Sequence, residues 1–211
     1  MTREGARAAL AGGSRFTKPR HPGDAVRLAA GLAILALSAE LAQRNRVGVL
    51  ETNTFRLVND LPDLLYPVFW LAMQAGNLIA VPLAVVAVAL LGRFRLALDL
   101  AVAGGSAWLL AKLVKQVVAR GRPPSLLGDV HLHGPAATGL GYVSGHAAVA
   151  VALATVASPY LGRRARRLAW VVAALVCLAR IYVGAHLPLD VIGGAALGWA
   201  TGALVHLLLG A

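Results

Sequence analysis

The sequence predicts an all-α, polytopic integral membrane protein with six transmembrane helices. The first reason is composition: of 211 residues, 58% are hydrophobic and 14% are charged, and the mean hydropathy is +0.71. A soluble domain is only about 45–50% apolar and about 25% charged. The second reason is that apolar stretches alternate with short polar links along the chain. A water-soluble globular domain is therefore excluded as the main architecture.

The chain begins with a segment that differs from the rest. Residues 1–22 are rich in Arg, Lys, Gly and Pro and contain no apolar stretch. They are too long and polar to be the first part of a cleaved signal sequence. We expect a disordered basic tail over 1–22 and one membrane domain over 23–211.

Six apolar runs approach the ~20 residues that cross a bilayer. The fourth and fifth are shorter than a perpendicular span needs, so apolar flanking residues or local thinning of the bilayer would have to help them. In the last span, Gly194, Gly198 and Gly202 recur every four residues and predict close approach to a neighbouring helix. The expected spans are 26–42, 71–91, 96–119, 146–161, 168–182 and 189–209.

Residues 51–67 lie between the first two expected spans and mix apolar with acidic side chains. Phe55, Leu57 and Leu64 alternate there with Asn59 and Asp63. This mixture is typical of an amphipathic segment in the plane of the membrane surface.

The net charge of +11 has two possible sources, nucleic-acid binding or the retention of Lys and Arg in cytoplasmic loops. Basic residues before the first span, between the second and third, and between the fourth and fifth all fall on one side of a six-span protein. This placement favours retention in cytoplasmic loops over nucleic-acid binding as the source of the charge. It predicts a protein of the cytoplasmic membrane with both termini in the cytoplasm. The residues are Arg3, Arg7, Arg15, Lys18, Arg20, Arg27, Arg93, Arg95, Arg163, Arg164, Arg166 and Arg167.

Other basic residues fall on the opposite, outer side. Lys112, Lys115, Arg120 and Arg122 lie at the outer end of the third span. Arg180 is about 18 Å into the fifth span at 1.5 Å per residue, so it should lie at membrane depth. A guanidinium there is costly unless it meets a partner, which makes Arg180 a functional candidate. The alternative is an interfacial residue whose head reaches the membrane surface.

Three segments at the outer side carry the candidate chemistry. Each has a simpler explanation, since basic side chains also anchor helices at interfaces, serine caps helices, and an acid in a first turn favours the helix dipole. Their convergence on one face of the membrane argues for a common site. The segments are Lys115 with Arg122 and Pro123, Ser144 with Gly145 and His146, and Arg180 with His186 and Asp190.

The cations of these segments predict a phosphate-binding site. Lys115 offers a point charge, and Arg122 and Arg180 offer planar forks that match nonbridging phosphate oxygens. Backbone N–H groups at Ser144, Gly145 and His146, at the start of a helix, add uncharged donors for the same anion. This arrangement requires no metal and no cofactor.

The two histidines predict a nucleophile and a proton donor. His186 and Asp190 are separated by one helical turn, so the carboxylate can orient the imidazole and stabilise its positive form. His146 is then free to protonate a departing alkoxide or phosphate.

The remaining histidines and the single cysteine have structural interpretations. We assign His21 and His206 no chemical role. His131 and His133 lie in the loop before the fourth span, and a solvated loop is favoured over metal or substrate binding because no third ligand has suitable spacing. Cys177, the only cysteine, excludes an intrachain disulfide and is expected to pack as a small hydrophobic side chain.

The three segments resemble the KxxxxxxRP, (P)SGH and (S)RxxxxxHxxxD patterns of the type 2 phosphatidic acid phosphatase superfamily, membrane lipid phosphatases related to vanadium haloperoxidases. The resemblance covers residues from about 55 to the C-terminus. It implies that the third to sixth helices pack around the active site, that His146 is the general acid, and that His186 becomes a phosphohistidine. Val143 replaces the usual Pro, which should loosen the loop, and Ala179 replaces the usual Ser, which should weaken the binding of one phosphate oxygen.

The function expected from this resemblance is metal-independent hydrolysis of a lipid phosphate or diphosphate on the extracytoplasmic side. Polyprenyl (di)phosphate, phosphatidic acid and phosphatidylglycerol phosphate are the substrate classes it implies. One alternative is a lipid phosphotransferase that uses the same intermediate. Another is a non-catalytic lipid-binding or transport protein. Expected partners are the lipid phosphate and the surrounding membrane lipids, without nucleic acid; the sequence predicts no oligomeric state.

Overall fold

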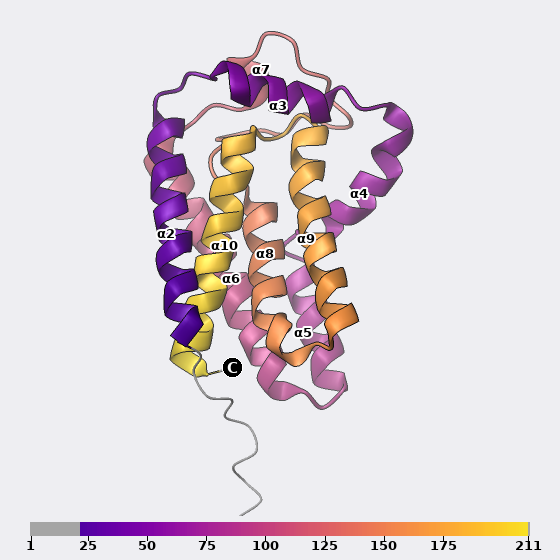
Figure 1. The fold of residues 1–211 in the computed structure, drawn as a ribbon. Coiled ribbons are helices and arrows are strands. Elements are labelled where there is room, and N and C mark those ends of the chain that lie inside the picture. The colour runs from indigo at the N-terminus through magenta and orange to yellow at the C-terminus, as the bar shows by residue number, and fades with distance from the viewer. Residues whose placement is uncertain (1–21, 211) are drawn as a thin grey trace, which may run out of the picture.

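The computed structural model describes residues 22–210, and every regular element in this range is a helix, which confirms the predicted all-α class (Figure 1). His21 and all but the last residue of the expected basic tail lie outside the described residues. Two short 3-10 turns, η2 and η3, interrupt the α-helices. In chain order the elements are α2 (Pro22–Gln43), α3 (Val49–Asn59), η2 (Asp63–Leu65), α4 (Tyr66–Gln74), α5 (Ala80–Leu90), α6 (Phe94–Val118), α7 (Pro123–Leu126), α8 (Gly145–Ala157), η3 (Ser158–Tyr160), α9 (Arg163–Tyr182) and α10 (Pro188–Leu209).

The last helix, α10, is the centre of the bundle and packs against α2, α6, α8 and α9. Small α10 residues face α8, and a Cβ atom at Gly194 or Gly198 would overlap the carbonyl oxygen of Ser144 or Ala148. A Cβ at Gly202 would lie 2.6 Å from Thr155 Cβ. The predicted close approach of the last helix to a neighbour is therefore confirmed.

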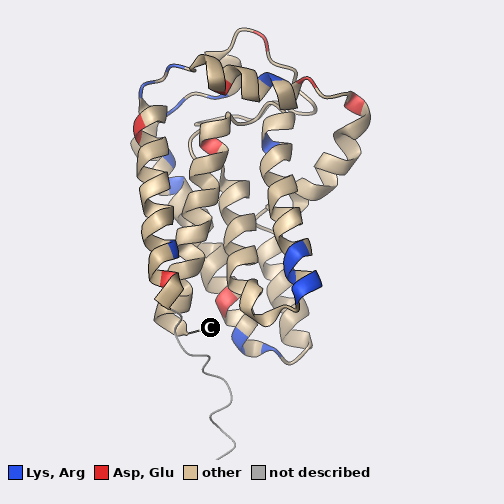
Figure 2. Ribbon diagram, viewed as in Figure 1, with Lys and Arg blue, Asp and Glu red and all other residues tan. Residues whose placement is uncertain are grey.

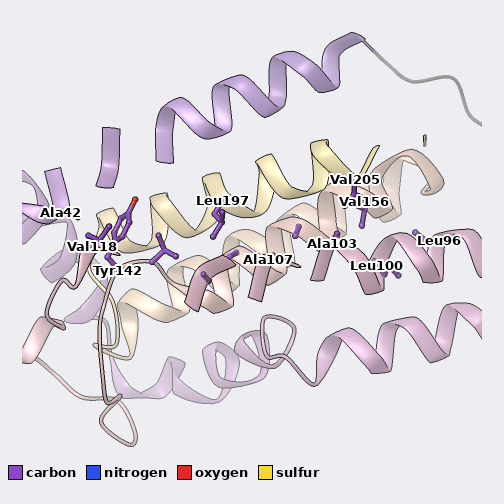
Figure 3. Close-up of a cluster of buried hydrophobic side chains, with 14 residues drawn as sticks. Ala42, Leu96, Leu100, Ala103, Ala107, Val118, Tyr142, Val156, Leu197 and Val205 are labelled. Atoms are coloured by element: carbon purple, nitrogen blue, oxygen red, sulfur yellow. The ribbon is translucent and has the colours of Figure 1, made fainter. Parts of the chain in front are cut away.

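The core between these helices is built largely from small side chains. Ala103 and Ala107 of α6 and Ala148 of α8 are fully buried in one cluster, together with Tyr142 from the loop before α8. Figure 3 shows Tyr142 at one end of this cluster. Its hydroxyl donates to Leu35 O at 3.0 Å and lies 2.8 Å from Ser38 Oγ. The loop before α8 is thus bonded to α2.

Cys177 and His206 both pack inside the helical bundle. Cys177 is half-buried against two apolar clusters, as predicted for a small hydrophobic side chain. His206 is buried on α10, and its Nδ1 atom lies 3.6 Å from Asp24 Oδ1 of α2.

The continuous span predicted over 71–91 is wrong, because two separate helices, α4 and α5, occupy this part of the chain. The chain turns between them at Gly76 and Asn77. A Cβ at Gly76 would lie 2.7 Å from His146 O, and the Asn77 side chain accepts a hydrogen bond from Ile79 N. The break therefore lets the backbone pass directly against the start of α8, while α4 packs on α9 and α5 packs on α6.

Three helical stretches are long and apolar enough to cross a membrane by length and composition: Pro22–Gln43, Phe94–Leu126 and Pro188–Leu209. The apolar stretches Ala80–Leu90 and Gly145–Tyr160 are shorter. The count of six spans remains a prediction. Figure 2 shows Lys and Arg gathered at the start of α9 and near the turn between α5 and α6, at the end of the bundle opposite α3 and α7.

The predicted amphipathic segment forms α3 and η2, and α3 lies across one end of the bundle (Figure 1). Its apolar Leu57 and the following Leu64 are exposed, by 75% and 86%. Phe55 and the polar Asn59 are buried against the bundle. The open face of α3 therefore carries apolar Leu57 beside polar Asn53, Thr54 and Arg56, and the other face is bonded to the protein, a mixture typical of a helix at a membrane surface.

Candidate active site

All the predicted site residues lie at the end of the bundle that α3 covers. His186 lies close enough to four other predicted residues for their charges to act on it: Lys115, Arg122, Arg180 and His146. Ser144 joins this group because its N–H donates to Asp190 O at 2.8 Å. The residues come from the last turn of α6 (Lys115), the start of α7 (Arg122), the start of α8 (Ser144, Gly145, His146), the last turn of α9 (Arg180), the α9–α10 loop (His186) and the first turn of α10 (Asp190).

Two of the cations are oriented by backbone carbonyls of the surrounding loops. Lys115 Nζ donates to Leu140 O at 3.1 Å and to Gly141 O at 3.0 Å. Arg122 Nη1 donates to Ala185 O, next to His186, at 2.7 Å. Both side chains are therefore fixed in position before an anion binds.

Arg180 and Ser144 hold polar atoms without a protein partner. Arg180 Nη1 reaches only Met73 Sδ, at 3.1 Å, and a thioether is a weak acceptor. Within residues 22–210, neither Arg180 Nε nor Ser144 Oγ has a hydrogen-bond partner, although both atoms are buried. Buried polar atoms are normally bonded. These two donors, together with the N–H groups of Gly145 and His146, can satisfy an oxyanion. The Ser144 N–H, which was also predicted to bind the anion, donates to Asp190 O instead.

His186 and Asp190 are neighbours, as predicted, but no direct hydrogen bond joins their side chains. His186 Nδ1 lies 3.6 Å from Asp190 Oδ2, and Oδ2 instead accepts from Leu187 N at 2.9 Å. Burial, followed by the positive charge of Arg180, holds the pKa of His186 well below its ordinary value of 6.5. The ring is therefore neutral at neutral pH, as a nucleophile must be.

Two further residues at this site, Arg120 and Glu51, were given no role by sequence reasoning. Arg120 is fully buried and donates both to Asp190 and to Glu51 of α3. An arginine two residues before the predicted Arg122 was a visible signal, but Glu51 had none, because its partner is 69 residues away in the chain.

The loop carrying His131 and His133 is bonded to α3, so the prediction that both histidines are solvated is wrong for His133. Its ring is buried, with Nδ1 2.7 Å from Asp63 Oδ1 and Nε2 2.9 Å from Asn59 O. The ring also stacks on Tyr182, with centroids 4.0 Å apart. His131 keeps an exposed side chain. Within residues 22–210, no three His, Cys, Asp or Glu side chains are grouped to hold a metal ion.

Val143 does not sit in a loose loop as predicted. Its side chain is fully buried in the main core cluster. The preceding Tyr142 is bonded to α2 and the following Ser144 to Asp190 O. Packing at Val143 thus holds the loop. Ala179 is also fully buried, against Phe69 of α4.

Comparisons with known proteins show the family and the fold. Residues 96–211 match the PAP2 superfamily. An undecaprenyl-diphosphatase of Sulfolobus acidocaldarius is 35% identical over 98 residues, which make up 43% of this chain and 44% of that relative. The matched part of the chain thus spans less than half the length of this curated relative.

Two crystal structures share the fold. Aquifex aeolicus LpxE superposes with a TM-score of 0.69 and 28% identity, covering 75% of this chain and 95% of LpxE. The first transmembrane PAP2 type phosphatidylglycerolphosphate phosphatase, from Bacillus subtilis, gives a TM-score of 0.69 and 20% identity, covering 83% of this chain and 94% of that protein.

Proposed function

This chain belongs to the PAP2 superfamily, and from that membership we propose that it hydrolyses a lipid phosphate or diphosphate, without a metal, through a phosphohistidine at His186. The observation that carries the proposal is that two histidines from different elements lie among three cations at one end of the bundle. Each cation attracts phosphate, and each histidine can take part in breaking a P–O bond.

Substrate binding uses the donors that the fold already positions. Hydrogen bonds to backbone carbonyls of neighbouring loops fix the orientation of the Lys115 and Arg122 side chains. Arg180 Nε and Ser144 Oγ supply donors that the described protein atoms leave unpaired. These groups bind the nonbridging oxygens and stabilise the charge that spreads over them in the transition state.

The reaction follows from the orientation of His186. Its Nδ1 atom faces Asp190, so Nε2 is the atom that attacks phosphorus. A bond forms between Nε2 and phosphorus while the P–O bond to the lipid breaks, and His146 gives its proton to the departing oxygen. Water then attacks phosphorus, the N–P bond breaks, and His146 takes the proton from water. Inorganic phosphate leaves and both histidines return to their starting states.

The membrane setting supports a lipid substrate on the extracytoplasmic side. The site lies under α3, whose open face includes the exposed apolar residues Val49, Leu50 and Leu57, and the basic turns of the bundle gather at the opposite end (Figure 2). Basic turns favour the cytoplasm, which supports an extracytoplasmic site. The undecaprenyl-diphosphatase and the phosphatidylglycerolphosphate phosphatase among the similar proteins support a polyprenyl or glycerolipid substrate.

The test separates the two histidines with two leaving groups. In detergent, His186→Ala should abolish hydrolysis of both a lipid phosphate and an activated aryl phosphate, because no nucleophile remains. His146→Ala should slow lipid phosphate hydrolysis by ~10² to 10⁴-fold, since an alkoxide needs a proton to leave. His131→Ala, which removes an exposed histidine, is the matched control and should match the wild type.

The aryl phosphate distinguishes the first step from the second. An aryl oxide leaves without protonation, so His146→Ala should release a burst of aryl alcohol and keep phosphate on His186 in an acid-labile, base-stable form. Turnover of the aryl substrate by His186→Ala, with no trapped phosphate in His146→Ala, would show that the covalent route is wrong.

A further inference from the structure

Arg120, a fully buried arginine two residues beyond the end of α6, links α3 to the site. Its Nη1 and Nη2 atoms donate to the two carboxylate oxygens of Glu51 at 3.0 and 2.7 Å. Nη1 also donates to Asp190 Oδ1 at 3.0 Å. A buried guanidinium needs such partners, because desolvation would otherwise make it strongly unfavourable. Arg120 therefore joins a carboxylate of α3 to the carboxylate beside His186.

These bonds determine how Asp190 faces the nucleophile. Oδ1 is taken by Arg120, and Oδ2 accepts from Leu187 N and lies 3.6 Å from His186 Nδ1. Glu51 Oε1 also accepts from Leu189 N at 3.0 Å, in the first turn of the same helix. Glu51 and Arg120 thus hold the start of α10 and the orientation of its carboxylate together.

The charges of the three side chains give Glu51 a second effect. Arg120 and Asp190 alone form a neutral pair, and a neutral pair stabilises a positive imidazole only weakly. Adding the Glu51 carboxylate leaves one net negative charge behind His186. The other groups that face His186 are Lys115, Arg122, Arg180 and His146, and none of them is negative. The ring becomes positive when Nε2 bonds to phosphorus, so this negative charge favours the phosphohistidine.

We propose that Glu51 and Arg120 are positioning residues for His186: they orient Asp190 and keep the net charge behind the imidazole negative. This inference rests on the proposed function, because the step that the two residues assist is formation of the phosphohistidine. The hydrogen bonds themselves do not depend on that function. Glu51 precedes residues 96–211, which match the superfamily. Helix α3 is therefore part of the support for the nucleophile as well as a surface segment.

Glu51→Gln is the direct test because it keeps the shape of the side chain and removes its charge. We expect kcat for an aryl phosphate to fall roughly 10- to 100-fold, as when the support of a functional imidazole is lost, with KM little changed. The acid limb of kcat/KM should move to lower pH, because a positive His186 is less well stabilised. Glu40→Gln, an exposed glutamate paired only with Arg44 at 3.6 Å, is the matched control and should leave both unchanged.

A second variant and a second measurement keep the result interpretable. Glu51→Asp keeps the charge but is one methylene shorter, so it should retain the position of the acid limb and recover part of kcat. If Glu51→Gln does not fold, Glu51→Asp alone tests the proposal. Partial kcat with an unmoved acid limb then supports it, and a loss of all activity in folded Glu51→Asp overturns it. Wild-type kcat and an unmoved acid limb in Glu51→Gln also overturn it.

A titration of His186 by ¹⁵N-histidine NMR in detergent separates this inference from the proposed function, because it needs no turnover. A lower pKa of His186 in Glu51→Gln with an inactive wild type would refute the phosphatase assignment and support the positioning role. If the wild type is active but the pKa of His186 is the same in Glu51→Gln, the phosphatase assignment is supported and the positioning role is refuted.

Discussion

Replacing Gly194 by Ala should reduce both catalysis and stability, whereas the same change at Gly202, further along α10, should reduce stability alone. Gly194 lies on α10 one turn beyond Asp190 and faces the start of α8. An added Cβ would overlap Ser144 O and lie 3.2 Å from Ala147 Cβ. Since neither contact is the flexible end of a long side chain, the start of α8 must move away from α10. His146 and the N–H groups of the first turn of α8 move with it.

The displacement caused by an added Cβ can be estimated at Gly202, where α10 contacts the other end of α8. At Gly202 an added Cβ would lie 2.6 Å from Thr155 Cβ, where ordinary contact begins at 3.4 Å, so the helices must separate by about 0.8 Å. Overpacking of this kind lowers the free energy of unfolding by about 1–3 kcal/mol at either position. Only Gly194→Ala displaces site groups, and a misplacement of about 1 Å reduces the rate by ~10²-fold.

The assay compares Gly194→Ala, Gly202→Ala and Gly105→Ala in one detergent. Gly105 has no atom within 4 Å of an added Cβ, so its variant is the control and should unfold at or slightly above the wild-type temperature. We expect about 100-fold lower kcat/KM for Gly194→Ala and near wild-type kcat/KM for Gly202→Ala. Equal catalytic losses in both α10 variants, or a fully active Gly194→Ala, would refute the argument that this contact positions the site.

Three further predictions concern pH, metal ions and topology. Because burial and the charge of Arg180 lower the pKa of His186, its neutral form persists as the pH falls, and the acid limb of kcat/KM should lie below pH 6.5; a limb at or above 6.5 would contradict this. Hydrolysis should survive EDTA and be inhibited by orthovanadate, which mimics the five-coordinate transition state, whereas loss on chelation with recovery on Mg²⁺ or Zn²⁺ would show that the cations do not suffice. In intact cells, Gly128→Cys should react with a membrane-impermeant thiol reagent and Arg164→Cys should not, and the reverse labelling would move the site to the cytoplasm.

The site residues were predictable where their chemistry is written in short spacings. His186 and Asp190 are four residues apart, at the entry to α10, and Ser144 and His146 share the start of one helix. Residues only two to four positions apart stay close in space however the helices pack. The structure therefore brings these residues together as predicted. The close approach along Gly198 was predictable for the same reason, since helical periodicity alone places small residues on one face.

Features that depend on distant partners were not predictable. In the sequence, Glu51 is one acid among several in an amphipathic segment, and only its contact with Arg120 in the structure distinguishes it. His133 reads as a loop residue until Asp63 and Tyr182 surround its ring. The break at Gly76 was overlooked because the apolar run continues on both sides, and only the backbone of α8 explains why the chain must turn there.

The contact between α2 and α10 has a consequence for how the protein is made. A Cβ at Gly31 of α2 would lie 3.0 Å from Ala196 O and from Ala200 Cβ, so the two helices touch closely. Synthesis proceeds from the N-terminus, and α2 therefore leaves the ribosome well before the helix against which it packs. The bundle can close only when α10 has been inserted, and the same event brings His186 and Asp190 to the cations already in place. A ribosome-bound chain that stops before α10 should accordingly be both loosely packed and inactive, and supplying α10 as a separate polypeptide offers a route to complementation.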